Sequence, residues 1–350
     1  MTALALSGAG NYRRTSLRRL ALVGLGLAAL GGAFLLDLSV GPGPSTLRDV
    51  AGALLDPAGA DPRLLVVVFD LRLPVALMAV LVGAMLGLGG AGMQTILNNP
   101  LADPFTLGVS AAASVGASLA IAVGWALVPG MGPLVVTVNA FAFALLASLA
   151  LFGLTKLRGV SSETMILVGI ALLFTSNAVL ALIQYRSNET QLQQIVFWIM
   201  GSLGRASFEK VLVCAAALGV AVPWLLARGW ALTALRLGDE RAESLGVKVD
   251  RLRLEVLALV SLLAALSVAF MGAIGFVGLV GPHIARLVVG EDQRFFLPAS
   301  ALASAVILSA ASTLSKAITP GVIYPIGMIT SLIGVPFFVS LILSIRSRGT

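Results

Sequence analysis

Charge is absent from long stretches of this 350-residue chain. No Asp, Glu, Lys or Arg occurs between Asp103 and Lys156. Six shorter stretches lack those four residue types as well: Leu73–Ala102, Thr164–Tyr185, Val211–Ala227, Val256–Ala285, Phe295–Ser315 and Ala317–Ile345. Because a charged side chain at the centre of a bilayer costs about 2.5–3.5 kcal/mol, stretches of this kind are typical of segments that lie in lipid. The sequence predicts a polytopic membrane protein.

Cysteine and histidine are almost absent too, with one residue of each, Cys214 and His283. A single cysteine excludes an intramolecular disulfide. One cysteine and one histidine cannot build a zinc or haem site within one chain. None of the four lysines follows a glycine, so no phosphate-binding P-loop is present. We therefore expect no enzymatic site and no cofactor bound by this chain itself.

Apolar residues fill the space that charge leaves, at 58% of the chain and a mean hydropathy of +1.02. A helix needs about 20 apolar residues to cross a bilayer. Divided at Gly and Pro, the sequence predicts about ten spans: 20–38, 72–97, 105–124, 133–155, 164–185, 193–202 with 208–227, 256–275, 277–289, 298–317 and 326–345. The outer part of the sixth span is expected to be a separate short helix. The fold class is therefore all-α, in one membrane domain over residues 20–345.

The distribution of basic residues predicts the orientation. If ten spans begin and end in the cytoplasm, 16 Lys and Arg residues lie inside and 7 outside. The segments 1–19 and 346–350 are then a cytoplasmic N-terminal segment and a cytoplasmic tail. The net charge of +7 reflects this topology, and nucleic-acid binding is not expected.

A short helix is expected outside the membrane, where Ser45 and Thr46 precede apolar residues at helical spacing through Leu55. It would lie on the periplasmic face, or it would be an ordinary capped loop helix with no contact role.

Ionisable side chains are missing from the predicted span centres, which offer the neutral groups Gln94, Asn139, Ser176 and Asn177. Carriers that use ion gradients usually keep such groups near the middle of the membrane. The glycine pattern Gly87–Gly92 lies inside a span, where small residues serve helix packing rather than nucleotide binding. Energy for transport would then come from a separate ATPase subunit.

One long hydrophilic segment, residues 236–255, carries five positive and five negative charges. Asp239 is predicted to cap a short helix and Gly246 to end it. The balanced charges favour a protein contact over attraction to anionic lipid, although a solvated loop would carry charge as well.

Several motifs follow one another from about residue 65 to 345: Arg72-Leu73-Pro74, Val82-Gly83 through Met93-Gln94, Asn98-Asn99-Pro100-Leu101-Ala102-Asp103-Pro104, Leu107-Gly108, Phe197-Trp198-Ile199-Met200-Gly201-Ser202, Ala242–Gly246 with its Leu-Gly, Gly272-Ala273-Ile274-Gly275-Phe276-Val277-Gly278-Leu279, Pro282-His283 with Arg286, and Gly334-Val335-Pro336-Phe337-Phe338. In this order and spacing the chain resembles the permeases that import iron chelates and vitamin B12, the membrane subunits of type II ABC importers. The resemblance implies two ten-helix permeases, as copies or paralogues, around a central pathway in a bacterial inner membrane. It also implies a cytoplasmic ATPase dimer, which would hold ATP and Mg, and a periplasmic binding protein.

The resemblance also assigns residues. The ATPase would contact the coupling segment 236–254 through Gly238, Asp239, Glu240, Arg241, Ala242, Glu243, Leu245 and Gly246. The binding protein would dock on Arg72 and Lys316, and the family's third basic position is Val75 here, so Arg63, Arg186 or Arg205 would compensate. Gate and pathway residues would be Gln94, Asn98, Asn99, Ser161, Ser162 and Glu163. His283 belongs to a Pro-His motif present whatever the cargo, which favours a structural role over haem ligation.

An iron–siderophore complex is the expected cargo, with haem or cobalamin as the alternative within the same family. Two alternatives lie outside it. An intramembrane enzyme would need metal-binding carboxylate pairs, and the adjacent pairs Asp239–Glu240 and Glu291–Asp292 have no companion motif. A secondary transporter would need buried charge.

Overall fold

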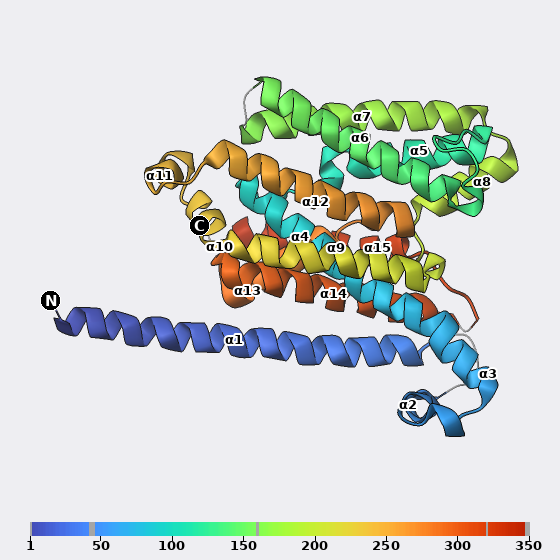
Figure 1. The fold of residues 1–350 in the computed structure, drawn as a ribbon, viewed down its shortest axis with the longest axis horizontal. Coiled ribbons are helices and arrows are strands. Elements are labelled where there is room, and N and C mark those ends of the chain that lie inside the picture. Colours follow the sequence, from blue (N-terminus) through green and yellow to red (C-terminus); the bar gives the residue numbers. More distant parts are fainter. Residues whose placement is uncertain (1, 42–45, 159–160, 320, 347–350) are drawn as a thin grey trace.

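The computed structural model describes residues 2–41, 46–158, 161–319 and 321–346, and every regular element among them is helical (Figure 1). The helices are α1 (Thr2–Ser39), α2 (Leu47–Leu55), α3 (Pro62–Leu65), α4 (Leu73–Ile96), α5 (Val109–Val123), α6 (Val135–Arg158), α7 (Ser162–Arg186), α8 (Glu189–Ile199), α9 (Phe208–Ala227), α10 (Gly229–Leu235), α11 (Asp239–Ser244), α12 (Val249–Met271), α13 (Val277–Val289), α14 (Gln293–Ala317) and α15 (Ile326–Arg346). A π-helical segment, Val66–Arg72, joins α3 to α4. Short 3-10 turns cover Pro57–Gly59, Pro104–Leu107, Gly132–Leu134 and Leu203–Arg205.

Each of the ten predicted spans corresponds to helical structure within the described residues. Seven helices there are long and apolar enough to cross a membrane, and Val109–Val123, Val277–Val289 and Ile326–Phe337 are shorter apolar helices. The sixth predicted span is indeed two helices, α8 and α9. Most of the predicted tail, residues 347–350, lies outside the described part of the chain.

Several predicted boundaries differ from the observed ones. The second span begins at Pro62 rather than residue 72, because α3, the π-helical segment and α4 form one continuous helix. The span predicted to start at Pro298 begins at Gln293, where the Asp292 carboxylate accepts a hydrogen bond from the Arg294 amide. The span predicted to reach residue 275 ends at Met271, because Gly272 adopts a positive φ of 79°. In each case a local cap or turn set the end, and hydropathy alone did not detect it.

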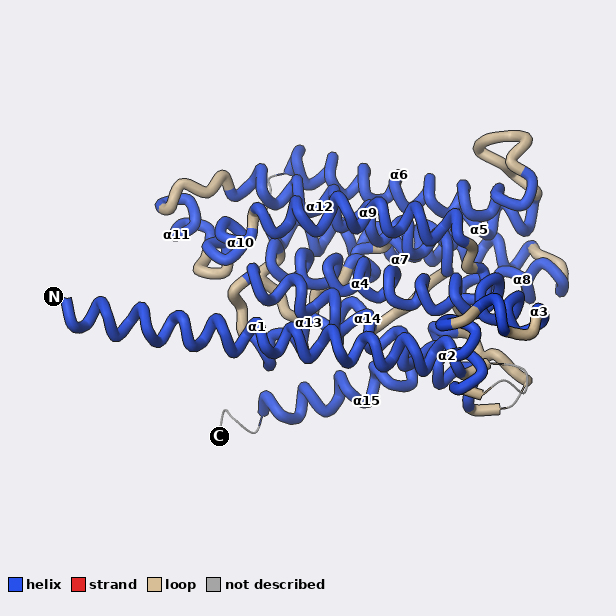
Figure 2. The backbone as a smooth tube through the Cα atoms, turned by 60° about the horizontal axis from the view of Figure 1, so that its bottom comes forward, coloured by secondary structure: helices blue, strands red, loops and turns tan. Residues whose placement is uncertain are grey.

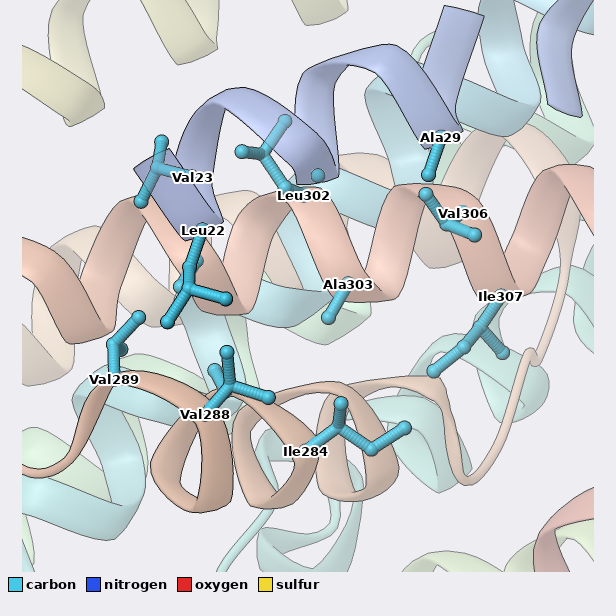
Figure 3. Close-up of a pocket in the computed structure, with 13 residues that line it drawn as sticks. Leu22, Val23, Ala29, Ile284, Val288, Val289, Leu302, Ala303, Val306 and Ile307 are labelled. Atoms are coloured by element: carbon cyan, nitrogen blue, oxygen red, sulfur yellow. The ribbon is translucent and has the colours of Figure 1, made fainter. Parts of the chain in front are cut away.

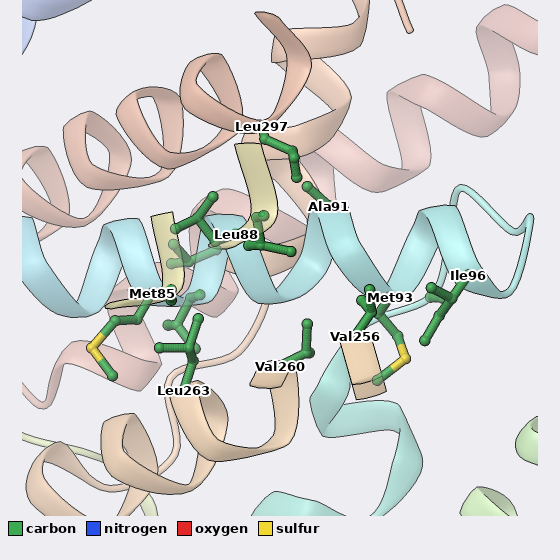
Figure 4. Close-up of a cluster of buried hydrophobic side chains, with 14 of the residues drawn as sticks. Met85, Leu88, Ala91, Met93, Ile96, Val256, Val260, Leu263 and Leu297 are labelled. Carbon is green, nitrogen blue, oxygen red and sulfur yellow. The ribbon is translucent and has the colours of Figure 1, made fainter. Parts of the chain in front are cut away.

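Helix α4 is the centre of the bundle and packs against α9, α12, α13 and α14. Its buried side chains meet those of α12 and α14 in one apolar cluster, which Figure 4 shows around Met85, Leu88 and Met93. Small residues set the distance between helices: a Cβ at Gly83 would lie 2.6 Å from the Ala305 Cα of α14. Close backbone approach is the main means by which helices associate in lipid, so α4 and α14 depend on this glycine.

The bundle has two distinct ends. Helices α10 and α11 lie at one end, called the α11 end here, and α2, α3 and α8 lie at the other, the α8 end (Figures 1 and 2). The short helix predicted after Ser45 is confirmed as α2, with Thr46 and Asp49 forming a capping box; Ser45 itself lies outside the described residues. Hydrogen bonds from the backbone and side chain of Thr46 lower the pKa of the Asp49 carboxyl.

Helix α1 lies at the edge of the bundle, mostly exposed, and packs chiefly on α14. Between α1, α13 and α14 lies an apolar cavity of about 240 Å³, shown in Figure 3 with Leu22, Ile284 and Leu302 among its lining residues. The packing along α1 is therefore loose at mid-length, and its C-terminal end is fixed by polar contacts instead.

Those polar contacts centre on a buried ion pair. The Lys316 ammonium of α14 lies 2.7 Å from Oδ1 of Asp37 in α1, and it also donates to the Asp37 backbone carbonyl at 2.6 Å. The Asp37 side chain is fully buried and that of Lys316 is 7% exposed. Thr313 donates a further hydrogen bond to the same carboxylate oxygen. Because the Asp37 carboxylate has no access to water, it depends on the Lys316 ammonium for its charge to be paired.

We predict that Lys316→Met will destabilise the isolated chain strongly, since it leaves the Asp37 carboxylate buried and unpaired. Breaking one partner of a buried pair costs on the order of 3–5 kcal/mol. The thermal unfolding midpoint in detergent measures this, and the double variant Asp37→Asn with Lys316→Met should recover most of the loss. An equal midpoint for wild type and Lys316→Met would contradict the assignment.

Candidate functional site

The predicted coupling segment forms a two-turn helix that stands out at the α11 end. α11 begins at Asp239, after Gly238 with φ of 99°, and the chain turns away at Gly246 with φ of 85°. The prediction that Asp239 caps this helix is wrong: Gly238 occupies the cap position, and the Asp239 carboxylate is bound by an arginine instead. The prediction that Gly246 ends the helix is confirmed.

One side of α11 is anchored and the other is open. Ala242 is fully buried against the bundle, whereas Glu240, Arg241, Glu243 and Leu245 are exposed. The exposed side therefore offers two carboxylates, one guanidinium and an apolar side chain to whatever approaches this end.

Arg253 of α12 binds three separate elements. Its guanidinium forms a bidentate pair with Asp239 of α11, with N–O distances of 2.7 and 2.9 Å. Its Nε donates to the Ile96 carbonyl at the end of α4 at 2.9 Å, and its Nη2 donates to the Ser162 hydroxyl of α7 at 3.3 Å. The Arg253 side chain is 5% exposed. This guanidinium thus joins the coupling segment to two of the predicted gate elements.

A second group of charges lies near the end of α4 as well. Arg236, at the end of α10, donates to the Asn98 side-chain oxygen at 2.7 Å and to Glu291 at 2.6 Å. Arg286 of α13 donates to Oε1 of Gln94 at 2.8 Å and lies 3.2 Å from the same Glu291. Two guanidiniums therefore share one carboxylate, and both also bind side chains at the end of α4.

The predicted gate residues are only partly brought together. Ser162 lies within 3.5 Å of the Ile96 carbonyl, and Asn98 adopts a left-handed φ of 46° at the turn after α4. Asn99 caps its own turn by accepting from the Leu101 amide. Ser161 caps α7, and Glu163 in the first turn of α7 is exposed. Ser162 is thus bonded to Arg253 and Asn98 to Arg236, and both lie near the end of α4, whereas Glu163 is exposed.

The two predicted docking residues lie at the α8 end and line one cavity of about 310 Å³. Arg72 is 6% exposed and donates to the backbone carbonyls of Leu38 and Ser39, at the end of α1. Val75, the departure from the family pattern, lines the same cavity, as do Ser312 and Tyr324. Both cations are therefore recessed below the surface rather than displayed on it.

Other singled-out residues have structural roles. Asn139 accepts from the Leu127 amide and donates to the Trp125 carbonyl, which fixes the turn before α6. The His283 ring packs edge-on against Phe337 at 5.8 Å. Among the described residues, no group of three His, Cys, Asp or Glu side chains could hold a metal ion.

Sequence reasoning missed three buried charged residues. Arg253 belonged to the hydrophilic segment, but nothing in its position predicts its contacts with Ile96 and Ser162. Asp37 lies near the end of a predicted span, and its partner is 279 residues away. Asp103 is 4% exposed and accepts a hydrogen bond from the Phe105 amide. The span centres offer mostly neutral groups, yet the chain does bury charged side chains where other groups of the same chain bind them.

Known proteins with similar sequences include permeases of transport systems. The model of the FecCD transport family matches residues 27–344. The hemin transport system permease protein of Yersinia pestis is 37% identical over 279 residues, which cover 80% of this chain and 84% of that protein. The vitamin B12 import system permease protein of Vibrio vulnificus is 39% identical over 271 residues, which cover 77% of this chain and 80% of that protein.

A solved structure shares the fold as well. A metal-chelate type ABC transporter in an inward-facing conformation matches with a TM-score of 0.79 and 30% identity, over 93% of this chain and 99% of that one. The match supports the arrangement of the helices over almost the whole chain.

Proposed function

This chain belongs to the FecCD transport family of ABC importer permeases, and from that premise we propose that it is the subunit through which an iron–siderophore complex crosses the cytoplasmic membrane. Haem and cobalamin importers of the same family are the alternative cargo classes. We place the α11 end, with both termini, in the cytoplasm, since the positive-inside count favours that orientation.

The single observation that carries the coupling role is the exposed side of α11, within a segment of balanced charge. A separate ATPase dimer would bind there, because this chain's sequence contains no P-loop. Charged and apolar side chains on a short helix of fixed orientation suit a specific protein contact. Helix α7, although apolar, is mostly exposed in the single chain, which supports pairing with a second copy or a paralogue across a shared pathway.

An open cavity of about 530 Å³ near α8 supports an anionic cargo. It is lined by Thr137, Gln193, Phe197, Arg205 and Lys210, together with other residues. Two cations beside amide and aromatic groups suit a metal chelate that carries carboxylate or catecholate groups. Ferric siderophores and haem both fit this description, whereas cobalamin would interact less strongly with the two cations.

The binding protein would insert an acidic side chain into the recessed cavity of Arg72 and Lys316. A carboxylate that enters such a cavity leaves water and meets the Arg72 guanidinium beside the Lys316 ammonium, which Asp37 already pairs, and the recess makes the contact directional. This docking role is a proposal that rests on the position of the two cations and on the resemblance.

We predict that Glu240→Arg combined with Glu243→Arg will abolish association with the ATPase without unfolding the permease, because both side chains are exposed and have reversed charge. Co-purification of the two subunits measures association, and the unfolding midpoint measures integrity. Glu209→Arg, at the opposite end of the bundle, is the matched control. Full co-purification of the double variant would remove the docking surface from α11.

We predict that Arg72→Gln will weaken docking of the binding protein by about tenfold, or 1.4 kcal/mol, and make it less sensitive to salt. Binding to the reconstituted permease at several salt concentrations measures both quantities. The exposed Arg63 of α3 provides a comparison, as Arg63→Gln. Loss of docking in Arg63→Gln, with Arg72→Gln unaffected, would move the docking surface to α3.

Uptake into liposomes by the permease with its ATPase and binding protein should require ATP and survive collapse of the proton gradient. The same system, screened with ferric siderophores, haemin and cobalamin for stimulated ATP hydrolysis, tests the cargo. Stimulation by cobalamin alone would overturn the siderophore proposal. Uptake driven by the proton gradient without ATP would overturn the importer mechanism itself.

A further inference from the structure

The turn that carries α11 is held to the end of α4 from both sides. Before α11, Arg236 donates to the Asn98 side chain, and after it, Arg253 donates to the Ile96 carbonyl. Ile96 is the last residue of α4, and Asn98 lies in the turn that follows it. Two arginines that precede and follow the coupling segment in sequence thus bind two neighbouring residues, one at the end of the central helix and one in the turn after it. We call this arrangement the arginine clamp.

We propose that Arg253 is the positioning residue that transmits movement of α11 to the end of α4 and to the start of α7. The inference rests on the proposed docking of an ATPase at α11. Arg253 touches neither cargo nor nucleotide in this assignment, and it acts by joining three elements at one guanidinium.

The contacts explain why an arginine is needed. The planar guanidinium has donors in a fixed fork, so two of them bind both oxygens of Asp239 while Nε points to the Ile96 carbonyl. The last carbonyls of a helix have no partner within it, and a cation is favourable there. A displacement of Asp239 therefore changes the geometry at Ile96 directly, since one rigid group makes both bonds.

The link reaches α7 through Ser162. Its hydroxyl accepts from Arg253 and donates to the Ile96 carbonyl at 3.5 Å, so the start of α7 is bonded to both the clamp and α4. Ser162 is the first residue of α7, a helix with few buried residues in the single chain. Movement of the guanidinium would therefore act on α7 at its first residue, where these bonds are made.

Arg236 is the second arginine of the clamp, but it also contacts a different part of the bundle. It shares Glu291 with Arg286 of α13, so it ties α4 to the part of the bundle that packs on α14. Arg236 therefore connects the end of α4 to α13 through the shared Glu291, whereas Arg253 connects it to α11. Because Arg253 is the arginine bonded to Asp239 of α11, it is the one that responds to the coupling segment.

The test measures the α7 end in the full complex, with the ATPase bound. A Cys214→Ala background removes the native thiol, and Glu163→Cys, at an exposed site in the first turn of α7, reports through its rate of labelling by a water-soluble maleimide. Rates are compared without nucleotide and with ATP plus vanadate. Arg253→Met and Arg253→Lys are introduced into this background.

The matched control is Arg251→Met, on the same helix two residues away. The Arg251 side chain is 73% exposed and pairs with Glu255 one turn along the same helix, at 2.7 Å. We expect Arg251→Met to respond to nucleotide as the parent does. In Arg253→Met the nucleotide-dependent change in labelling rate should fall at least about fivefold, the lower end for coupled sites, while ATPase association persists.

If the Arg253→Met permease does not assemble with the ATPase, Arg253→Lys tests the proposal instead. A lysine ammonium cannot bind both Asp239 oxygens, the Ile96 carbonyl and the Ser162 hydroxyl in the observed fork, so its response should be reduced as well. A full parental response in either assembled Arg253 variant overturns the proposal. Absence of a nucleotide response, or of ATPase association, in the parent itself would instead contradict the proposed function.

Discussion

Lipid supplies no hydrogen bonds, so each charge that this bundle buries must be satisfied by the protein itself. The central helix shows how this is done. Arg72, just before α4, donates to the carbonyls at the end of α1, and Arg253 donates to the carbonyl at the end of α4. Both guanidiniums bind the ends of helices, where carbonyls lack partners. The polar contacts of the fold are therefore concentrated at the two ends of the bundle, and the middle is joined by close packing of small residues.

This separation has a functional consequence. The middle of α4 is locked to α14 at Gly83 and to α13 at Gly90, where any side chain would collide with the neighbouring backbone. Movement within such a core is costly because interiors are densely packed. The ends, by contrast, are held by arginines whose bonds can be exchanged. A transporter built in this way would change conformation at its ends while its central packing stays constant.

The site was predictable in part, and the reason differs from residue to residue. The position of α11 followed from its charge and from Gly246, because a glycine stop is a local property. The cap was misplaced because the Asp239 carboxylate is drawn to Arg253, a contact that depends on how α12 folds back. Lys316 and Arg72 were found through resemblance, but their burial, and the pairing of Lys316 with Asp37, came from the packing of α1 on α14.

The amino-acid sequence by itself determined that this chain lies in a membrane, crosses it with about ten helices and displays one charged segment, since hydropathy, charge and helix stops act over short distances. Its family followed from motifs in order. Only the tertiary structure decided which distant residues bind these charged side chains: Ile96 and Ser162 bind Arg253, Asn98 binds Arg236, and Asp37 binds Lys316. These partners are 91 to 279 residues apart in the sequence, and helix packing alone brings them within bonding distance.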